Sequence, residues 1–599
     1  MAEKLYNDYL HKIKNQIHLD PKQFWKFVKS KRGSNSFPTS MTLDDVTSDD
    51  PIIISKLFAS FFSHSHNGSD SHVDSNYFKY MLNCPKTYYS GYIPDCSKVM
   101  ESISTLKDEY FPGPDGVPAV VIKRCSAPLV PILVHLFSLS LQSTIFPDLW
   151  KLSFITPTHK KGTRNSIRNY RPIAKLSTIP KLFEASIYDA LFFHCKSILS
   201  HKQHGFVSKR STTTNLVHFT STVTRALERG SEVDCIYTDF SKAFDTLSHD
   251  IITFKLNMLG FPDFFIAWIS SYLSNRSYQV LFKSCLSPPF VVNSGVPQGS
   301  HLGPLLFILA INDVTNVISH SDILVYADDM KIFKVVTNVI DHCRLQNDIN
   351  EFYIWCKMNN LCLNMDKCHV MTFSRKRAPS VHNYKVNSNR VSRVCNMSDL
   401  GVIFDTKLEF IDHIQMVVNK ANSVLGFVRR WSRELSDPYI TKALYVSFVR
   451  PILEYASPVW SPHYSSHIKR IESVQRRFVR LSLRSLPWND PYRLPPYENR
   501  LQLLNLNTLQ RRRDVTDTLF IFKVLTGNID DPQILSVIDF NLRTFNSRTH
   551  DILISRYHRT NYGMHEPISR MVRLFNDAKK YIDFHIDKEE LKTLLYSKI

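Results

Sequence analysis

Two adjacent carboxylates near the middle of the chain are flanked on both sides by apolar residues. Asp328 and Asp329 follow residues 323–327, Ile-Leu-Val-Tyr-Ala, and precede residues 330–333, Met-Lys-Ile-Phe. Short apolar runs separated by a turn are typical of paired strands, so the pattern predicts a β-hairpin with the acids at its tip. Two anions beside a hydrophobic sheet repel each other unless a cation neutralises them. Their hard oxygen ligands favour Mg²⁺.

A third carboxylate stands at the end of another predicted strand. Residues 235–238, Cys-Ile-Tyr-Thr, run into Asp239, and the segment through Asp245 turns away before a predicted helix. A strand-end Asp and a hairpin-tip Asp pair supply three carboxylates for two cations. Two-metal phosphoryl transfer needs such a set, because one ion activates the attacking hydroxyl and the other steadies the leaving pyrophosphate. Spacing alone leaves open a purely structural role for Asp239.

Glycine is scarce in this chain, with 16 residues, yet three glycines cluster at Gly295, Gly299 and Gly303. A residue without a side chain lets another backbone approach closely. No Gly-Lys-Ser/Thr sequence follows, so the segment is not a phosphate-binding Walker loop. It predicts either a tight turn before the apolar helix that begins near Leu305, or a surface for a nucleotide that hydrogen-bonds Gln298.

The charge of the chain favours a polyanionic partner. Lys and Arg total 74 against 54 Asp and Glu, a net charge of +20, and nucleic acid is the simplest partner for such a protein. The first residues lack the apolar core of a secretory signal, and the 11 cysteines include no Cys-x-x-Cys pair, so we expect an intracellular protein with reduced thiols. Residues 129–146 are apolar but include Pro131 and several polar residues, which predicts a buried core helix and no membrane partner.

Sequence patterns divide the chain into four predicted regions, which together indicate an α+β protein. Residues 1–95 are expected to form an N-terminal extension and linker, and residues 96–375 a mixed core of strands and helices. Residues 376–485 and 486–599 are expected to be mainly helical and basic. Within them, helices are predicted at residues 406–430, 437–455 and 467–484.

Three motifs, in their order along the chain, resemble the A, B and C motifs of reverse transcriptases. They are Asp239-Phe-Ser-Lys-Ala-Phe-Asp245, Gly295-Val-Pro-Gln-Gly-Ser300 and Tyr326-Ala-Asp-Asp329. More narrowly, the chain resembles non-LTR retrotransposons of the jockey and chicken-repeat-like branch, from about residue 24 to about residue 530. The segment Ser300-His-Leu-Gly-Pro-Leu-Leu-Phe307 favours this branch over group II intron maturases, which also carry Tyr-Ala-Asp-Asp.

This resemblance implies a right-hand polymerase with fingers, a palm built on an antiparallel sheet, and a thumb, followed by a mainly helical basic region. It assigns two Mg²⁺ ions, for which Mn²⁺ can substitute, to the carboxylates of Asp239, Asp328 and Asp329 and the carbonyl of Phe240. It also implies roles for six further residues: Phe244 as a steric gate against the 2′-hydroxyl, Gln298 and Gly299 beside the incoming nucleotide, Tyr326 beside the primer terminus, Arg171 on the triphosphate, and Lys367 as a proton donor near the pyrophosphate.

Other segments resemble the family more loosely. Lys160 and Lys161 are either phosphate ligands or solvated lysines, and residues 204–214 either position the template or cap a helix. A basic face in the thumb-like region is expected to follow the phosphates of an RNA–DNA hybrid. Its residues are Lys420, Arg429, Arg430, Arg476, Arg477 and Arg480.

The expected function is RNA-directed DNA synthesis within a cytoplasmic and nuclear ribonucleoprotein. Its partners would be an RNA template, a DNA primer and deoxynucleoside triphosphates. The family's pre-polymerase signature, Phe-Trp-Lys at residues 24–26, comes almost at once, so we expect no N-terminal endonuclease in this chain and a need for a separate or upstream one. The alternatives are a catalytically inactive nucleic-acid-binding remnant of a truncated element, against which the three retained acids argue, and a group II-type maturase.

Overall fold

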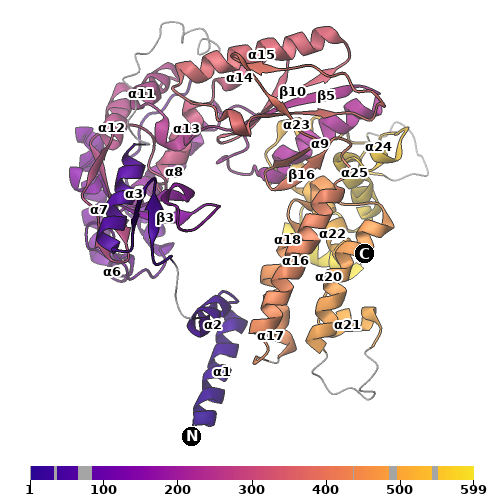
Figure 1. The fold of residues 1–599 in the computed structure, drawn as a ribbon, viewed down its shortest axis with the longest axis horizontal. Helices are drawn as coiled ribbons and strands as arrows, with labels where there is room; N and C mark the ends of the chain where they lie inside the picture. Colours follow the sequence, from indigo (N-terminus) through magenta and orange to yellow (C-terminus); the bar gives the residue numbers. More distant parts are fainter. Residues whose placement is uncertain are drawn as a thin grey trace.

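The computed structural model describes residues 2–32, 37–64, 84–435, 437–483, 495–541 and 551–598. Figure 1 shows two arms that extend in the same direction from a central region, one drawn in indigo and purple and the other in orange. Helices accompany the sheets up to Asp405 and form the remaining named elements, which agrees with the predicted α+β class.

A five-stranded sheet in the central region contains the predicted hairpin. Most neighbours in this central sheet are antiparallel, and only β14 pairs in parallel, with β11. Alternate residues of β5 face opposite sides, since Ile236 joins one hydrophobic core and Cys235 the other. The strands in spatial order are β14 (Ser392–Arg393), β11 (His369–Phe373), β5 (Glu232–Thr238), β10 (Asp329–Val336) and β9 (Asp322–Tyr326).

Helices cover both faces of the central sheet. On one side, α9 (Thr212–Glu228) packs against β5 and contributes Leu216 and Phe219 to the core that it shares with the C-terminal helices. On the other side lies a second core built around α13, the apolar helix predicted near Leu305. The helices of this second core are α5 (Cys96–Ser104), α6 (Ala119–Arg124), α7 (Ser126–Ser143), α8 (Thr178–Cys195), α10 (Ala243–Thr246), α11 (His249–Met258), α12 (Asp263–Leu273), α13 (Leu302–Ala310), α14 (Val314–Val317) and α15 (Val339–Met358).

Helix α7 differs from its prediction as a buried core helix. Val130, Leu133 and Phe137 are buried, but the opposite face, with Ile132 and Leu139, is exposed. By length and composition, α7 is the one helix among the described residues that is apolar enough to cross a membrane, and 22% of that span is buried in the protein. The apolar composition predicted a buried core helix, whereas the fold covers only one stripe of the helix.

A second sheet lies in the indigo and purple arm (Figure 1). Its strand order is β4-β3-β6-β7, and β8 also pairs with β6. Helix α3 (Pro51–Ser63) packs against this second sheet, so part of the predicted N-terminal extension shares a core with later residues. The strands are β3 (Leu152–His159), β4 (Tyr170–Lys175), β6 (Arg276–Phe282), β7 (Cys285–Leu286) and β8 (Phe290–Val292), and a short hairpin, β1 (Met41–Leu43) with β2 (Val46–Ser48), lies beside them.

After the central sheet the chain forms two hairpins and becomes helical, as predicted. The hairpins are β12 (Lys385–Val386) with β13 (Asn389–Arg390), and β15 (Asn396–Asp399) with β16 (Val402–Asp405). The helices are α16 (Ile411–Trp431), α17 (Pro438–Leu444), a π-helix (Tyr445–Val449), α18 (Arg450–Glu454), α19 (Ser457–Trp460), α20 (Ser465–Leu483), α21 (Tyr497–Leu503), α22 (Leu509–Leu525), α23 (Pro532–Leu535), α24 (Asn561–Met564), α25 (Pro567–Asp577) and α26 (Lys588–Lys598). We call α16, the segment from α17 to α18, and α20 the helical arm, drawn in orange in Figure 1.

The first two helices pack against the end of the helical arm. Helices α1 (Ala2–Leu19) and α2 (Gln23–Arg32) share a small core with α16 and α17. Trp25 stacks on Phe427 with ring centroids 5.3 Å apart. The chain then reaches the second sheet, where Phe37 contacts Phe282 at 4.8 Å. The N-terminal segment therefore bridges the free ends of the two arms (Figure 1).

Candidate active site

Asp328 and Asp329 occupy the hairpin tip that the sequence predicts. Strands β9 and β10 pair with Asp329 opposite Tyr326, which leaves Ala327 and Asp328 as a two-residue turn. Ala327 adopts a left-handed conformation with φ of +56°, as two-residue hairpin turns require. The predicted hairpin is confirmed.

A neighbouring loop supports this turn through contacts that the sequence did not predict. The side-chain oxygen of Gln203 accepts hydrogen bonds from the backbone N–H of Ala327 at 3.0 Å and of Gly205 at 2.8 Å. A side chain on Gly205 would lie 2.5 Å from the Ala327 nitrogen, so only glycine permits this approach. Residues 204–214 thus support the hairpin tip and also begin α9 with a capping box at Ser211.

Asp239 lies beside the hairpin tip, at the same end of the sheet. Thr238 pairs with Met330 across β5 and β10, and Asp239 is the next residue after Thr238. Its backbone carbonyl accepts a hydrogen bond from Asn364 at 2.8 Å, and its Oδ2 accepts one from Lys367 Nζ at 2.5 Å. The structure therefore brings together the three predicted carboxylates and the predicted lysine.

The three carboxylates repel one another electrostatically. Asp329 keeps access to solvent, yet the surrounding protein atoms and then Asp328 raise the pKa of its carboxyl group to about 6. Desolvation and the charge of Asp239 likewise raise the pKa of Asp328, against the opposing effects of Arg171 and Lys160. A bound cation would relieve this repulsion.

These residues fit a divalent cation that is shared with a nucleotide. Among the described residues, no three acidic, His or Cys side chains form a ready-made metal cage. Mg²⁺ in nucleotide-dependent sites commonly takes only one or two carboxylates, and substrate phosphates and waters complete its coordination. Asp239, Asp328 and Asp329 meet that requirement, and Phe240, whose carbonyl was predicted as a further ligand, follows Asp239 directly and pairs with Leu363.

Basic side chains from β4 and the preceding loop lie within electrostatic range of the same carboxylates. Arg171 lies on β4 and is exposed. Burial, followed by the charges of Arg171 and Lys367, lowers the pKa of Lys160, so these three cations lie within electrostatic range of one another. Lys161 lines the same cavity as Asp239, Asp329 and Lys367. The arrangement places Arg171, Lys160 and Lys161 where an anionic substrate would reach them.

The glycine segment is a close-packed loop between β8 and α13. Gly299 has φ of +124°, and a side chain there would collide with the carbonyl oxygen of Ala174 on β4. A side chain on Gly295 would lie 2.5 Å from the carbonyl oxygen of Phe244. The side chain of Gln298 donates a hydrogen bond to Asp245 at 2.6 Å. The loop thus joins the strand that carries Arg171 to the segment that follows Asp239.

Phe244 is held in a fixed orientation by other rings. It stacks on Phe307 of α13 with centroids 4.1 Å apart and an interplanar angle of 18°. Phe206 meets it edge-on at 6.1 Å. A half-buried ring with this support is suited to steric selection, because it cannot move aside easily.

A buried ion pair beneath the hairpin is a second feature that the sequence analysis missed. Lys331, two residues after Asp329 on β10, pairs with Asp399 of β15, and both are buried. The pair links the strand that carries Asp329 to the hairpin β15–β16. Lys331 was visible in the sequence as a cation inside an apolar run, but nothing local identified Asp399 as its partner.

The predicted basic face lies on α16 and α20 of the helical arm. Its six residues are all exposed, and they are Lys420, Arg429, Arg430, Arg476, Arg477 and Arg480. Arg477 of α20 donates a hydrogen bond to Asn422 of α16 at 3.0 Å, whereas Arg476 lies over the Tyr497 ring of α21 at 4.4 Å, so the six charges are spread around the two helices.

The middle of the chain is similar to known proteins. Residues 158–424 match the family described as reverse transcriptase (RNA-dependent DNA polymerase). The chain is 28% identical over 397 residues to the probable RNA-directed DNA polymerase from transposon BS of Drosophila melanogaster, covering 64% of this chain and 44% of that protein. It is 26% identical over 397 residues to the corresponding protein of transposon X-element of the same species, covering 64% and 43%, respectively. It is also 26% identical over 411 residues to the RNA-directed DNA polymerase from mobile element jockey, covering 65% and 44%. The chain thus spans less than half the length of these relatives.

Proposed function

We propose that this chain, which contains a reverse transcriptase domain at residues 158–424, is the RNA-directed DNA polymerase of a non-LTR retrotransposon. It would extend a DNA primer on an RNA template by using deoxynucleoside triphosphates. One observation carries the proposal: Asp239 and the pair Asp328–Asp329 meet at one end of the central sheet inside the matched segment. We assign the central sheet to the palm, the arm with the second sheet to the fingers, and the helical arm to the thumb.

In the proposed reaction the primer 3′-hydroxyl attacks the α-phosphate of the nucleotide, and pyrophosphate leaves. Asp239, Asp328 and Asp329, with the carbonyl of Phe240, would hold two divalent cations. When bound, these cations would neutralise charge on the attacking and leaving oxygens. Tyr326, opposite Asp329 in the hairpin, would flank the primer terminus.

Basic residues from the fingers would bind the triphosphate. The planar guanidinium of Arg171 matches phosphate oxygens in pairs, and Lys160 lies within its electrostatic range. Gln298 and Gly299 would form the surface beside the incoming nucleotide, because their loop joins β4 to the segment after Asp239. The ring of Phe244 would lie beneath the sugar and exclude a 2′-hydroxyl.

Lys367 would change partners during the reaction. In the structure it donates a hydrogen bond to Asp239, a proposed cation ligand. A cation at Asp239 would displace the ammonium group by charge repulsion. Lys367 would then be available to donate a proton to the leaving pyrophosphate.

Primer extension on poly-rA with an oligo-dT primer and Mg²⁺ tests the proposal. We expect the wild-type chain to extend the primer and Asp328→Asn to lose at least about a hundredfold in rate, because one negative ligand is removed from the site. Asp322→Asn is the matched control, since Asp322 lies at the other end of β9 and pairs with Lys202 at 3.2 Å.

Extension that survives Asp328→Asn at the wild-type rate would exclude the proposed mechanism. A wild-type chain that binds the RNA–DNA hybrid but never extends it would instead identify an inactive remnant. The two outcomes are distinguished by measuring hybrid binding and extension on the same preparation.

A further inference from the structure

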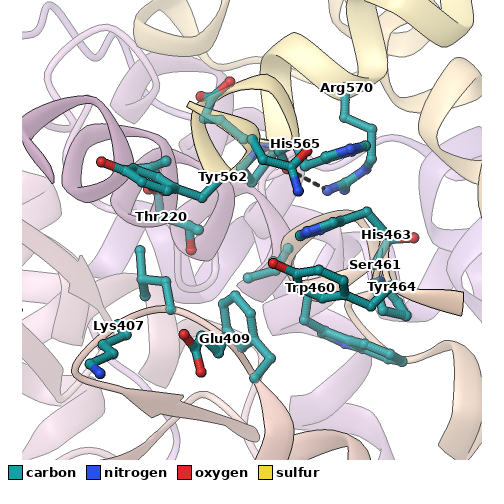
Figure 2. A pocket seen from close by; sticks show the side chains of 18 of the residues that line it. Thr220, Lys407, Glu409, Trp460, Ser461, His463, Tyr464, Tyr562, His565 and Arg570 are labelled. Atoms are coloured by element: carbon teal, nitrogen blue, oxygen red, sulfur yellow. Dashed lines mark hydrogen bonds between the residues drawn. The ribbon is translucent and has the colours of Figure 1, made fainter. Parts of the chain in front are cut away.

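A cavity outside the proposed polymerase site has the chemistry of a site for one flat, polar ring. It lies where α9, the loop before α16, the loop before α20, and α24–α25 meet (Figure 2). Its volume is about 120 Å³. An engineered apolar cavity of about 150 Å³ holds benzene, so the enclosed part of this space takes one ring of a base.

Aromatic rings form one wall of the cavity. His463 and His565 stack in parallel with centroids 4.2 Å apart and an interplanar angle of 3°. Tyr464 lies against His463 with ring centroids 4.0 Å apart and is tilted by 41° from it, so three rings cluster in this wall. Figure 2 shows Tyr562 across the open space from Trp460 and Tyr464. Rings on facing sides of a narrow space are the arrangement in which a nucleobase stacks.

The cavity also contains polar atoms without partners. Thr220 Oγ1 and His463 Nε2 are buried, and neither has a hydrogen-bond partner among the described residues. Neither atom opens onto the cavity as it stands, so a ligand reaches them only after a small shift of the lining; the hydrogen bonds made then are favourable, because a buried polar atom without a partner is costly. Burial, followed by the charge of Arg570, lowers the pKa of His463, so this ring is neutral near pH 7 and can accept or donate through Nε2 according to its tautomer.

Arg570 is the most deeply buried cation of the lining, and each of its three guanidinium nitrogens donates a hydrogen bond to the protein. Its guanidinium donates to Asp517 at 2.8 Å, to the carbonyl of His565 at 3.1 Å and to that of Pro458 at 2.6 Å. The interior therefore lacks a free charge for a phosphate. The recognition groups that remain are rings and neutral polar atoms, which favours a base over a phosphate inside the cavity.

Cations are instead found at the rim. Arg375 and Lys407 are exposed and line the cavity, and Arg375 lies over the Tyr562 ring at 4.1 Å. Lys469 and Arg470, on the first turns of α20, are also exposed, although they do not line the cavity, and Arg470 donates a hydrogen bond to Gln415. Glu409 is the exposed acid of the lining, and it lies 3.9 Å from Arg375. A phosphate backbone would meet net positive charge at this rim.

We infer that this cavity binds one unpaired base of single-stranded RNA, whose backbone crosses the basic rim. The inference rests on the proposed function and adds to it an RNA contact outside the polymerase site. It also gives residues 561–570 of the C-terminal region a role in holding the template. A base-paired nucleotide would not enter, because its hydrogen-bonding edge and both faces are already occupied in a duplex.

Fluorescence of 2-aminopurine tests the inference with the full chain. The probe is an unstructured oligo-A RNA of about 12 nucleotides with one internal 2-aminopurine, a length within the range of single-strand sites. We expect the wild-type chain to change the probe's emission and to bind it more tightly than the double variant Thr220→Val/Tyr464→Ala, by about tenfold. Tyr557→Ala is the matched control, because Tyr557 lies in the same C-terminal region, is 90% exposed and does not line the cavity.

Primer extension on a short preannealed RNA–DNA hybrid should be unchanged in the double variant. This result separates the inference from the proposed function, whose failure would abolish extension in the wild-type chain as well. Wild-type affinity for the probe in the double variant would overturn the inference. So would equally tight competition by adenosine monophosphate, which would indicate a small-molecule site, or by a duplex of the same sequence.

Photo-crosslinking covers the case in which the double variant does not fold. The wild-type chain is irradiated with the same RNA carrying 4-thiouridine, and the attached peptide is identified by mass spectrometry. Attachment within residues 460–467 or 561–565 is expected. Attachment confined to other regions would refute the inference.

Discussion

At Asp239, one carboxylate oxygen is already paired with a cation that the protein itself supplies. Lys367 Nζ lies 2.5 Å from Asp239 Oδ2. We propose that a divalent cation at Asp239 would repel this ammonium group, which would link cation binding to the position of Lys367. The lysine proposed to act on the leaving group would then be released when the site is loaded.

At the same scale, we predict that the ring of Phe244 selects deoxynucleotides over ribonucleotides. Replacing it in Phe244→Val removes the flat surface while the Phe307 ring beneath it stays in place. We expect the preference for deoxynucleotides over ribonucleotides, measured as the ratio of kcat/KM values, to fall by about tenfold or more, which corresponds to about 1.4 kcal/mol.

Single-nucleotide incorporation with dTTP and UTP measures this ratio. Phe264→Val on α12 is the control, because that ring is 45% exposed and lies outside the site. An unchanged ratio in Phe244→Val would show that another group reads the sugar.

Some residues of the site were visible in the sequence and others were not, for a physical reason. The hairpin tip at Asp328 could be predicted because strand alternation and turn geometry are local properties. Gln203 and Asp399 act through partners 124 and 68 residues away, respectively, and no local pattern records such contacts. Side chains that support a site from a distance are therefore the ones that sequence reasoning missed.

Among the elements, the glycine loop is fixed by its contact with β4. Gly299→Ala places a side chain against the Ala174 carbonyl and strains a backbone at φ of +124°. We expect a loss of more than about 2 kcal/mol in the free energy of unfolding, together with a raised KM for nucleotide, because β4 carries Arg171.

The control is Gly230→Ala, which has φ of +78° but meets nothing within 4 Å. It carries a comparable backbone penalty without the collision, so nucleotide KM should stay at the wild-type value. An equal change of KM in both variants would contradict a specific role for the contact with β4.

We predict that buried His413 makes helix α16 less stable in acid. His413 is 1% exposed, and its Nδ1 accepts a hydrogen bond from the Ile403 amide at 3.2 Å. Burial lowers its pKa from 6.5 to about 4. Between these values the unfolded state binds more protons, so the contribution of His413 to stability is complete above pH 6.5 and is lost as pH falls toward 4.

The variant His413→Asn keeps an acceptor near the Ile403 amide but cannot take up a proton. Between about pH 7.5 and about pH 5, we expect the opening free energy of α16 to fall by on the order of 1–2 kcal/mol more in the wild type than in the variant. Hydrogen exchange of the α16 amides measures this difference. Parallel pH profiles for the two proteins would refute the assignment to His413.

The predicted helix boundaries were wrong where a side chain or a proline interrupts the helical hydrogen bonding. Helix α16 begins at Ile411 rather than near residue 406, because the Asp405 carboxylate accepts the N–H groups of Lys407, Glu409 and Phe410 and holds a turn. The helix predicted over residues 437–455 contains a π-turn just before Pro451, whose missing N–H interrupts regular hydrogen bonding. The end predicted at Arg484 lies outside the described residues.

At the scale of the whole molecule, the N-terminal helices α1 and α2 pack on the free end of the helical arm. Trp25→Ala removes the stacked ring at Phe427 and the edge contact with Phe448. We expect this packing to weaken by about 1–2 kcal/mol, and the α2 amides to exchange hydrogen faster while those of the central sheet do not change.

Leu19→Ala is the control for this variant, because Leu19 is 86% exposed at the end of α1. Hydrogen exchange read by mass spectrometry compares the two proteins. If the α2 amides in Trp25→Ala exchange as they do in the control, Trp25 does not hold the two helices in place.

The same bridge has a topological consequence. Only residues 33–36 separate Arg32, at the end of the helical arm, from Phe37, on the second sheet, and five extended peptide units span at most about 18 Å. The polypeptide therefore completes a ring with the central sheet and both arms. A duplex that lay within that ring could slide along its own axis without opening the ring. It could leave sideways only after α1 and α2 had released the helical arm, so the grip on one nucleic acid through many additions would depend on the small core that these helices share with α16 and α17.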